Sequence, residues 1–469
     1  MSRGLRGTIG AAVLIAVACG GGAGGGGAGP GDAGGDAGAA AGGAGAVAGA
    51  AGAGGSSGSA ATGGGSGAGG AGGGGGGGAS GAGGAASCLA SELLAYLGRP
   101  HVMVGLSGDD ASARAAPFDL RYVYLAGAFP DGGQPCASCA TGCTSGGTSC
   151  ANSGPGCAWW GCWQWDQDPP GAYARDFFSK VEADGQIPMI TWYTLLHASG
   201  VGEGQPEVAV ANDVAFMTAY FAQWRFLLEQ VGSTKALLHL EPDFWGYAQH
   251  AGGDPAAIPA AVASANPTDC GALPNTFAGL GRCLIRMARV HAPSARVGLH
   301  GSGWGTGVDV LQNDSASLDV AGEARKLADF LVALGAAEGD FLVVDPSDRD
   351  AAWYEAQGQD RWWDATGQSL PDFDQALGWA AALAERARLP ILWWQVPVGN
   401  ASLPNQPNQW QDNRVDWFFA HLPEVAAAHG IGVAYGAGQG DQTTPETDGG
   451  NLIAKATAYQ ASGRTPACP

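Results

Sequence analysis

From Cys88 onward, short apolar runs alternate with longer stretches in which apolar residues recur at helical spacing, as in 210–232 and 321–336. Runs this short are typical of buried strands. Repeated strand–helix–strand units require parallel pairing with right-handed crossovers. The pattern predicts a (β/α)8 TIM-type barrel, with an open doubly wound sheet as the alternative. The expected strands span 101–106, 121–127, 187–196, 236–241, 295–300, 340–345, 390–395 and 430–436.

The segment before Cys88 has a different composition. Residues 20–87 are almost entirely Gly, Ala and Ser, with too little apolar surface to offset the entropy of ordering. We therefore expect a disordered linker over 20–87 and one barrel domain over 88–469, a length sufficient for a single large core.

The first nineteen residues read as an export signal. Arg3 and Arg6 precede an uncharged stretch from Thr8 to Ala18 that is too short to cross a bilayer. The following Cys19 completes a run, Ala16-Val17-Ala18-Cys19, that resembles the lipobox of bacterial lipoproteins, although the usual Leu is Ala16 here. The resemblance implies lipidation of Cys19 and a lipid anchor at the bacterial cell surface or outer membrane. The alternative is a plain secretory signal and a secreted protein.

Cysteine usage agrees with an oxidising compartment. Besides Cys19 the chain has an even number of cysteines, and we expect Cys88 with Cys468 and Cys270 with Cys283 as plausible pairs. Six more crowd one Gly/Ser-rich stretch without a His, which predicts a disulfide-rich loop insertion rather than the alternative, a zinc site. They are Cys136, Cys139, Cys143, Cys150, Cys157 and Cys162. No metal is expected.

Net charge narrows the choice of partners. The formal charge is -20 and no basic run is present. Such a surface repels phosphates, so nucleic acid and anionic lipid are not expected as ligands. The chain also lacks dinucleotide and P-loop fingerprints, so no cofactor is expected.

Carboxylates gather where expected strands end, which is where barrel active sites lie. Leu240-Glu241-Pro242-Asp243 closes one strand, and strand alternation predicts that Glu241 projects into the barrel mouth with Asp243 beside it. A buried carboxyl with a raised pKa beside an ionised one is what glycosidic bond cleavage needs. We predict Glu241, Asp243 and Asp345 as catalytic, with Asp109 or Asp110 as the next candidates. Helix capping or a loop ion pair is the alternative for Glu241 and Asp243.

Most of the sixteen tryptophans fall in or beside strand-to-helix connections. Flat rings at the mouth can stack on sugar rings while amide and imidazole groups bind hydroxyls. Core packing is the alternative for the rings, and a satisfied strand-end amide for Gln395. The predicted substrate-binding residues are Trp192, Tyr193, Trp245, His300, Trp304, Trp393, Trp394 and Gln395.

Leu240 to Asp243, with LHGSGWG at 299–305, is similar to motifs of the cellulases of glycoside hydrolase family six. The resemblance implies that Asp243 is the general acid of an inverting mechanism and that Glu241 supports it. Two departures stand out. The stretch 191–200 lacks the carboxylates that close an earlier strand in that family, and Gln395 stands where the large retaining clan of barrel glycosidases has a Glu.

Together these features predict an exported glycoside hydrolase with a carbohydrate substrate, a β-glucan in the first instance. The alternative is a surface lipoprotein that binds glycans on a degenerate barrel without catalysis.

Overall fold

The computed structural model describes residues 88–126, 129, 144–145, 148–149, 163 and 170–468. The predicted signal segment 1–19 with Cys19, the linker 20–87 and all six cysteines of the predicted loop insertion lie outside these residues. Three of the tryptophans in or beside the predicted strand-to-helix connections also lie outside the described residues. They are Trp159, Trp160 and Trp165.

Eight parallel strands close into a barrel, which confirms the (β/α)8 prediction. Their order around the barrel is β1-β10-β9-β8-β7-β6-β5-β2, and β1 pairs with β2 to close it. Nearly all strand residues are buried, because helices cover one side and the barrel interior the other. The barrel strands are β1 (Met103–Leu106), β2 (Leu120–Leu125), β5 (Ile187–Trp192), β6 (Leu237–Leu240), β7 (Arg296–His300), β8 (Phe341–Val344), β9 (Ile391–Val396) and β10 (Gly430–Tyr435).

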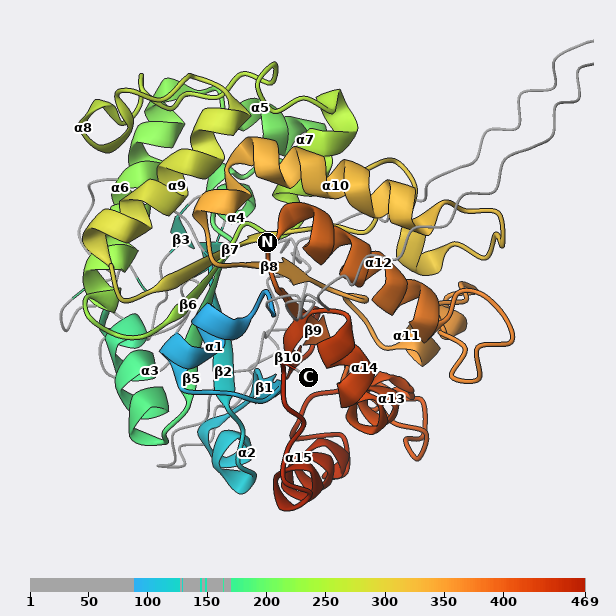
Figure 1. Ribbon diagram of the computed structural model, residues 1–469. Helices are drawn as coiled ribbons and strands as arrows, with labels where there is room; N and C mark the ends of the chain where they lie inside the picture. The colour runs from blue at the N-terminus through green and yellow to red at the C-terminus, as the bar shows by residue number, and fades with distance from the viewer. Residues whose placement is uncertain are drawn as a thin grey trace, which may run out of the picture.

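Helices surround the strands in Figure 1. The longest, α6, starts where the Asp213 side chain accepts a hydrogen bond from the Phe216 N–H, and it turns Trp224 and Leu228 into the core. The α-helices are α1 (Ser91–Leu97), α2 (Asp110–Ala115), α3 (Ala172–Ala183), α4 (Leu195–Ser199), α5 (Gln205–Val210), α6 (Val214–Val231), α7 (Phe244–Gly252), α8 (Pro267–Cys270), α9 (Phe277–His291), α10 (Val320–Leu334), α11 (Ala351–Ala356), α12 (Phe373–Ala387), α13 (Arg414–Ala420), α14 (Leu422–Ala427) and α15 (Asn451–Ala461).

Three smaller elements complete the fold. Two 3-10 turns, η3 (Val310–Gln312) and η4 (Ala336–Glu338), flank α10. In the segment between β2 and α3, β3 (Thr144–Ser145) and β4 (Thr148–Ser149) form an antiparallel pair. Among the described residues, no helix is both long and apolar enough to cross a membrane.

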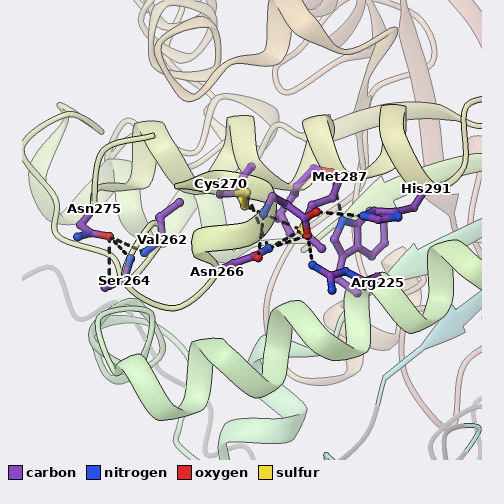
Figure 2. Close-up of a disulfide and its surroundings, with 12 residues drawn as sticks. Arg225, Val262, Ser264, Asn266, Cys270, Asn275, Met287 and His291 are labelled. Carbon is purple, nitrogen blue, oxygen red and sulfur yellow. Dashed lines mark hydrogen bonds and ion pairs between the residues drawn. A yellow bond between two sulfur atoms is a disulfide. The ribbon is translucent and has the colours of Figure 1, made fainter. Parts of the chain in front are cut away.

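Two disulfides confirm the predicted pairs. Cys88–Cys468 joins the start of the described domain to its end, and Cys270–Cys283 joins α8 to α9. Figure 2 shows Asn266 beside the second disulfide, where it caps α8 and its side-chain amide lies 3.3 Å from the Met287 sulfur. This short crosslink fixes α8 against α9.

Candidate active site

The loops that follow the strand ends form the mouth of the barrel, and there the structure brings Asp243, Asp345 and His300 together. Nε2 of His300 lies 3.2 Å from Oδ1 of Asp345 and 4.0 Å from Oδ1 of Asp243. The three side chains come from the ends of β7 and β8 and from the turn after β6. Two predicted catalytic carboxyl groups therefore lie within 4.0 Å of one imidazole nitrogen.

Backbone geometry points Asp243 into the mouth. Both Glu241 and Asp243 have positive φ angles, 44° and 62°, which non-glycine residues rarely adopt. Asp243 is the first residue before α7, yet its side chain makes no capping hydrogen bond. The side chain is 38% exposed. Capping thus does not account for Asp243, and strained backbone of this kind gathers at functional sites.

Partial burial raises the pKa of Asp243 to about 7. His300 acts in the opposite direction and lowers it, whereas the nearby carboxyl groups of Asp345, Glu203 and Asp348 raise it. A carboxyl group in this environment keeps its proton near neutral pH, which is the property that a general acid requires.

Behind His300 lies a hydrogen-bonded row that we call the imidazole chain, formed by Thr191, His239 and His300. Nδ1 of His239 is 3.2 Å from the Thr191 hydroxyl, and Nε2 of His239 is 3.1 Å from Nδ1 of His300. All three residues are buried. The Trp394 ring packs edge-on against both imidazoles, with centroids 4.6 Å and 5.9 Å away, so it forms part of the floor of the site.

Glu241 does not join the group at the mouth. Its carboxyl group is buried and accepts hydrogen bonds from the Thr194 and Leu195 N–H groups at 3.3 Å and 3.1 Å, and from the Tyr220 hydroxyl at 2.7 Å. Burial raises the pKa of Glu241 to about 8, and these hydrogen bonds lower it. The alternation that predicted a mouth position fails because the positive φ of Glu241 ends the extended strand geometry. Its contacts connect the ends of β6 and β5 to α6.

We therefore expect Glu241→Gln to reduce kcat less than about tenfold, since the side chain only supports Asp243 through the backbone. Glu241→Ala removes the acceptor of two buried N–H groups and of the Tyr220 hydroxyl, which keeps only the hydrogen bond that it accepts from Trp192 among the described residues. This should cost roughly 3 kcal/mol of stability. Denaturant unfolding of both variants beside kcat measurements checks this. A loss of about 10²-fold in kcat for a stably folded Glu241→Gln would instead place Glu241 among the reacting groups.

Several predicted sugar-binding rings are part of the core, a correction to the sequence analysis. Trp192 faces outward and packs on Tyr220 and Trp224, while Trp393 packs on Trp363 and Phe418. Both are fully buried, and so is Trp245, whose indole donates to the Leu240 carbonyl at 2.9 Å. Successive strand residues alternate, so only one of Trp393 and Trp394 can face the barrel interior. Trp394 does so, and it too is buried.

The other predicted binding residues lie at the mouth. Tyr193 and Trp304 are half-buried, and Trp304 packs on Tyr247 with ring centroids 4.7 Å apart. Gln395 is buried, has a positive φ of 54°, and accepts a short hydrogen bond from the Tyr124 hydroxyl. The oxygen of the Gln395 amide therefore has a partner within the protein.

Several residues at the mouth were not singled out by the sequence pattern. The exposed carboxylate of Glu203 accepts from the Tyr193 and Tyr247 hydroxyls at 3.4 Å and 3.3 Å. Across the site, Asp348 binds the Tyr354 hydroxyl and the Arg349 guanidinium through short contacts. Glu203 lies several residues beyond its strand end, between α4 and α5, so a search confined to strand ends could not find it.

The remaining carboxylate candidates have structural roles. Asp109 caps α2 by accepting from the Ser112 N–H at 2.6 Å. Asp110 pairs with Arg121 at 2.5 Å, and this contact lowers its pKa. Both carboxyl groups thus contact residues other than those gathered around His300. No group of three or more His, Cys, Asp or Glu side chains is arranged for a metal ion within the part of the chain that the structure describes.

Two buried carboxyl groups connect the loops that follow β8, β9 and β10 through hydrogen bonds and one ion pair. Asp350, after β8, accepts from the Gly399 N–H after β9 and the Thr443 N–H after β10, at 2.9 Å and 2.8 Å. Asp412 binds the Arg414 guanidinium at 2.6 Å and accepts from the Ala351 N–H at 2.7 Å. Burial and the neighbouring Asp412 raise the pKa of Asp350. We call Asp350, Asp412 and Arg414 the loop network.

No protein-family model matches the chain, and no curated protein matches it in sequence. Among solved structures, an endo-β-1,4-mannanase from Cellulomonas fimi is similar at 12% identity, covering 80% of this chain and 74% of that chain, with a TM-score of 0.45. A family 26 β-mannanase from Bacteroides ovatus is similar at 10% identity, covering 81% and 94%, with a TM-score of 0.42.

An endoglucanase from Mycobacterium tuberculosis matches a smaller part, with 13% identity over 48% of this chain and 56% of that chain, and a TM-score of 0.27. The structures that are similar to this chain thus include glycoside hydrolases. Identities this low concern the fold and do not transfer an activity or a substrate.

Proposed function

We propose that the chain is a glycoside hydrolase in which Asp243 is the general acid and Asp345 the second carboxylate. The observation that carries the proposal is the pair of carboxyl groups on one buried imidazole, at the mouth of the barrel. Asp243 has the raised pKa that an acid needs at neutral pH, and it is open to solvent on one side.

In the proposed reaction Asp243 gives its proton to the glycosidic oxygen as the bond from that oxygen to the anomeric carbon breaks. A water molecule forms the new bond to the anomeric carbon, and Asp345 takes the proton that this water loses. After release of both sugars, Asp243 regains a proton and Asp345 gives one up, so the protein returns to its starting state.

The rings and charges at the mouth support an uncharged sugar chain as the substrate, and we propose a β-linked glucan in the first instance. Tyr193, Tyr247 and Trp304 offer half-buried rings, and Trp353 is half-buried as well, with the Arg349 guanidinium 4.5 Å from the centre of its ring. Rings of this kind stack on the apolar faces of sugars. The carboxylates of Glu203, Asp345 and Asp348 repel uronic acids, so acidic polysaccharides should be poor substrates.

The substrate would be met outside the cytoplasm. The run ending in Cys19 supports a lipid-anchored protein, and residues 20–87 would act as the tether between anchor and barrel. Mass spectrometry of the mature chain tests this, because lipidation predicts a diacylglyceryl group on an N-terminal Cys19. An unmodified N-terminus would indicate the plain secretory signal.

Turnover is expected to fall on the alkaline side as Asp243 ionises. Its raised pKa means that the protonated, active form persists up to about pH 7 and is lost as the pH rises through that value. Above about pH 8, kcat/KM on a soluble oligosaccharide should fall about tenfold per pH unit. A profile that stays flat from about pH 7 to pH 9 would contradict the assignment of Asp243 as the acid.

The direct test is product release by the full chain from a panel of β-glucans, xylan, mannan and polygalacturonate. Release of oligosaccharides from a neutral polysaccharide, with little from polygalacturonate, is expected. The rival function is glycan binding without catalysis. It is favoured by Gln395 at the end of β9, where an amide, not a carboxyl group, accepts a hydrogen bond from the Tyr124 hydroxyl. Binding to insoluble glycan without product from any substrate would establish the rival.

A further inference from the structure

We propose that the imidazole chain holds the proton of His300 on Nε2 and thereby decides which carboxyl group is the acid. This inference rests on the proposed function, because it assigns separate roles to Asp243 and Asp345. Thr191 and His239 are positioning residues in this scheme, since they act only through His300.

The chain is built across three neighbouring strands. Thr191 of β5 and His239 of β6 are register partners, and His300 follows at the end of β7. Their contacts of 3.2 Å and 3.1 Å run in one line from the barrel interior to the carboxyl groups. All three side chains are buried, so these contacts are shielded from solvent.

The contact between the nitrogens of His239 and His300 holds one hydrogen. Burial and the neighbouring His300 lower the pKa of His239 well below its usual value, so this ring carries a single proton. If that proton is on Nε2, it is donated to Nδ1 of His300, and Nδ1 of His239 accepts the Thr191 hydroxyl proton. The proton of His300 then lies on Nε2, facing Asp345 and Asp243.

Asp345 disfavours the opposite direction of hydrogen bonding, in which Nδ1 of His300 donates to His239. That arrangement would place the lone pair of the His300 Nε2 3.2 Å from an oxygen of Asp345, and two acceptors repel unless this carboxyl group is protonated. With the proton on Nε2, the imidazole instead stabilises negative charge on Asp345, which is nearer than Asp243 by the two measured distances. Negative charge on Asp345 in turn opposes ionisation of Asp243.

The other titratable groups around Asp243 and Asp345 are tyrosines and carboxyl groups from the surrounding strands and loops. They are Tyr124, Tyr193, Tyr247, Glu203, Glu207, Asp309 and Asp348. Trp394 from β9 and Thr191 from β5 pack on the imidazoles but bring no charge. The direction of the imidazole chain is thus set at its Asp345 end.

Nitrogen NMR of the full chain labelled with 15N-histidine tests the inference without any substrate. His300 should show a protonated-type shift at Nε2 and an unprotonated-type shift at Nδ1 at neutral pH, with signals assigned through His300→Gln and His239→Gln. A proton on Nδ1 of His300 would overturn the inference. The readout is independent of turnover, so failure of the proposed function would leave this result interpretable.

A pH profile gives the second readout. His239→Leu removes the donor to Nδ1 of His300 and lets the His300 proton move to that nitrogen. The negative charge on Asp345 then loses its stabilisation by Nε2, so the acidic limb of kcat/KM should move to a higher pH, by about one unit. His239→Gln can place an amide N–H at the same point and should retain the limbs of the unmodified protein. A fall in kcat for His239→Leu with both limbs unmoved would mean a purely structural role and contradict the inference.

Discussion

Asp243→Asn is expected to lower kcat by at least about 10²-fold on any glycan that the unmodified protein cleaves, with little change in KM. Asparagine keeps the size and polarity of the side chain but cannot donate a proton to the leaving oxygen. We expect other groups, such as the rings of Tyr247 and Trp304, to carry sugar binding, so that only the chemical step suffers. Steady-state kinetics on a soluble oligosaccharide separates the two parameters.

Two companion variants sharpen the experiment. Asp345→Asn should also reduce kcat by about 10²-fold, because it removes the group that we propose accepts the proton from water. Asp184→Asn makes the same chemical change at the opposite end of the barrel, between α3 and β5, and should leave kcat unchanged. A substrate with an activated leaving group, which needs no acid, should restore much of the rate in Asp243→Asn. Failure of that rescue would show that Asp243 acts on binding or folding instead.

The barrel could be predicted because its signal is local. Strands such as 341–344 and 391–396 are buried on both sides and therefore read as continuous apolar runs, and the intervening helices keep their own apolar spacing. Even the two disulfide pairs could be suggested from the sequence, since one lies near the ends of the domain and the other spans a short separation.

The site could be predicted only in part because it depends on backbone angles and on contacts between distant strands. Strand alternation correctly turns His239 inward, but it fails two residues later, where Glu241 adopts a positive φ. Strand-end position also does not separate Trp394, which faces the interior, from Trp393, which faces the helices. The imidazole chain is invisible in the sequence because His239 and His300 belong to different strands.

Asp412→Ala is expected to cause the largest loss of stability, roughly 3–5 kcal/mol, because it leaves a buried guanidinium without its carboxylate. Arg414 is fully buried, and among the described residues its guanidinium keeps only the Arg361 carbonyl at 2.8 Å and the face of Trp363 as partners. The variant also strips the Ala351 N–H, at the start of α11, of its acceptor. Denaturant unfolding at neutral pH measures the change as a shift of the midpoint.

Two controls separate this effect from the loss of any ion pair. Asp416→Ala breaks a half-exposed pair with Lys455 and should cost about 1 kcal/mol or less. Replacing both partners, Asp412→Leu with Arg414→Met, should recover much of the loss, since the unpaired charge is then gone. Because the loop network holds the segments after β8, β9 and β10 together, Asp412→Ala should also raise KM. A midpoint shift no larger than that of Asp416→Ala would mean that the buried pair does not hold these loops.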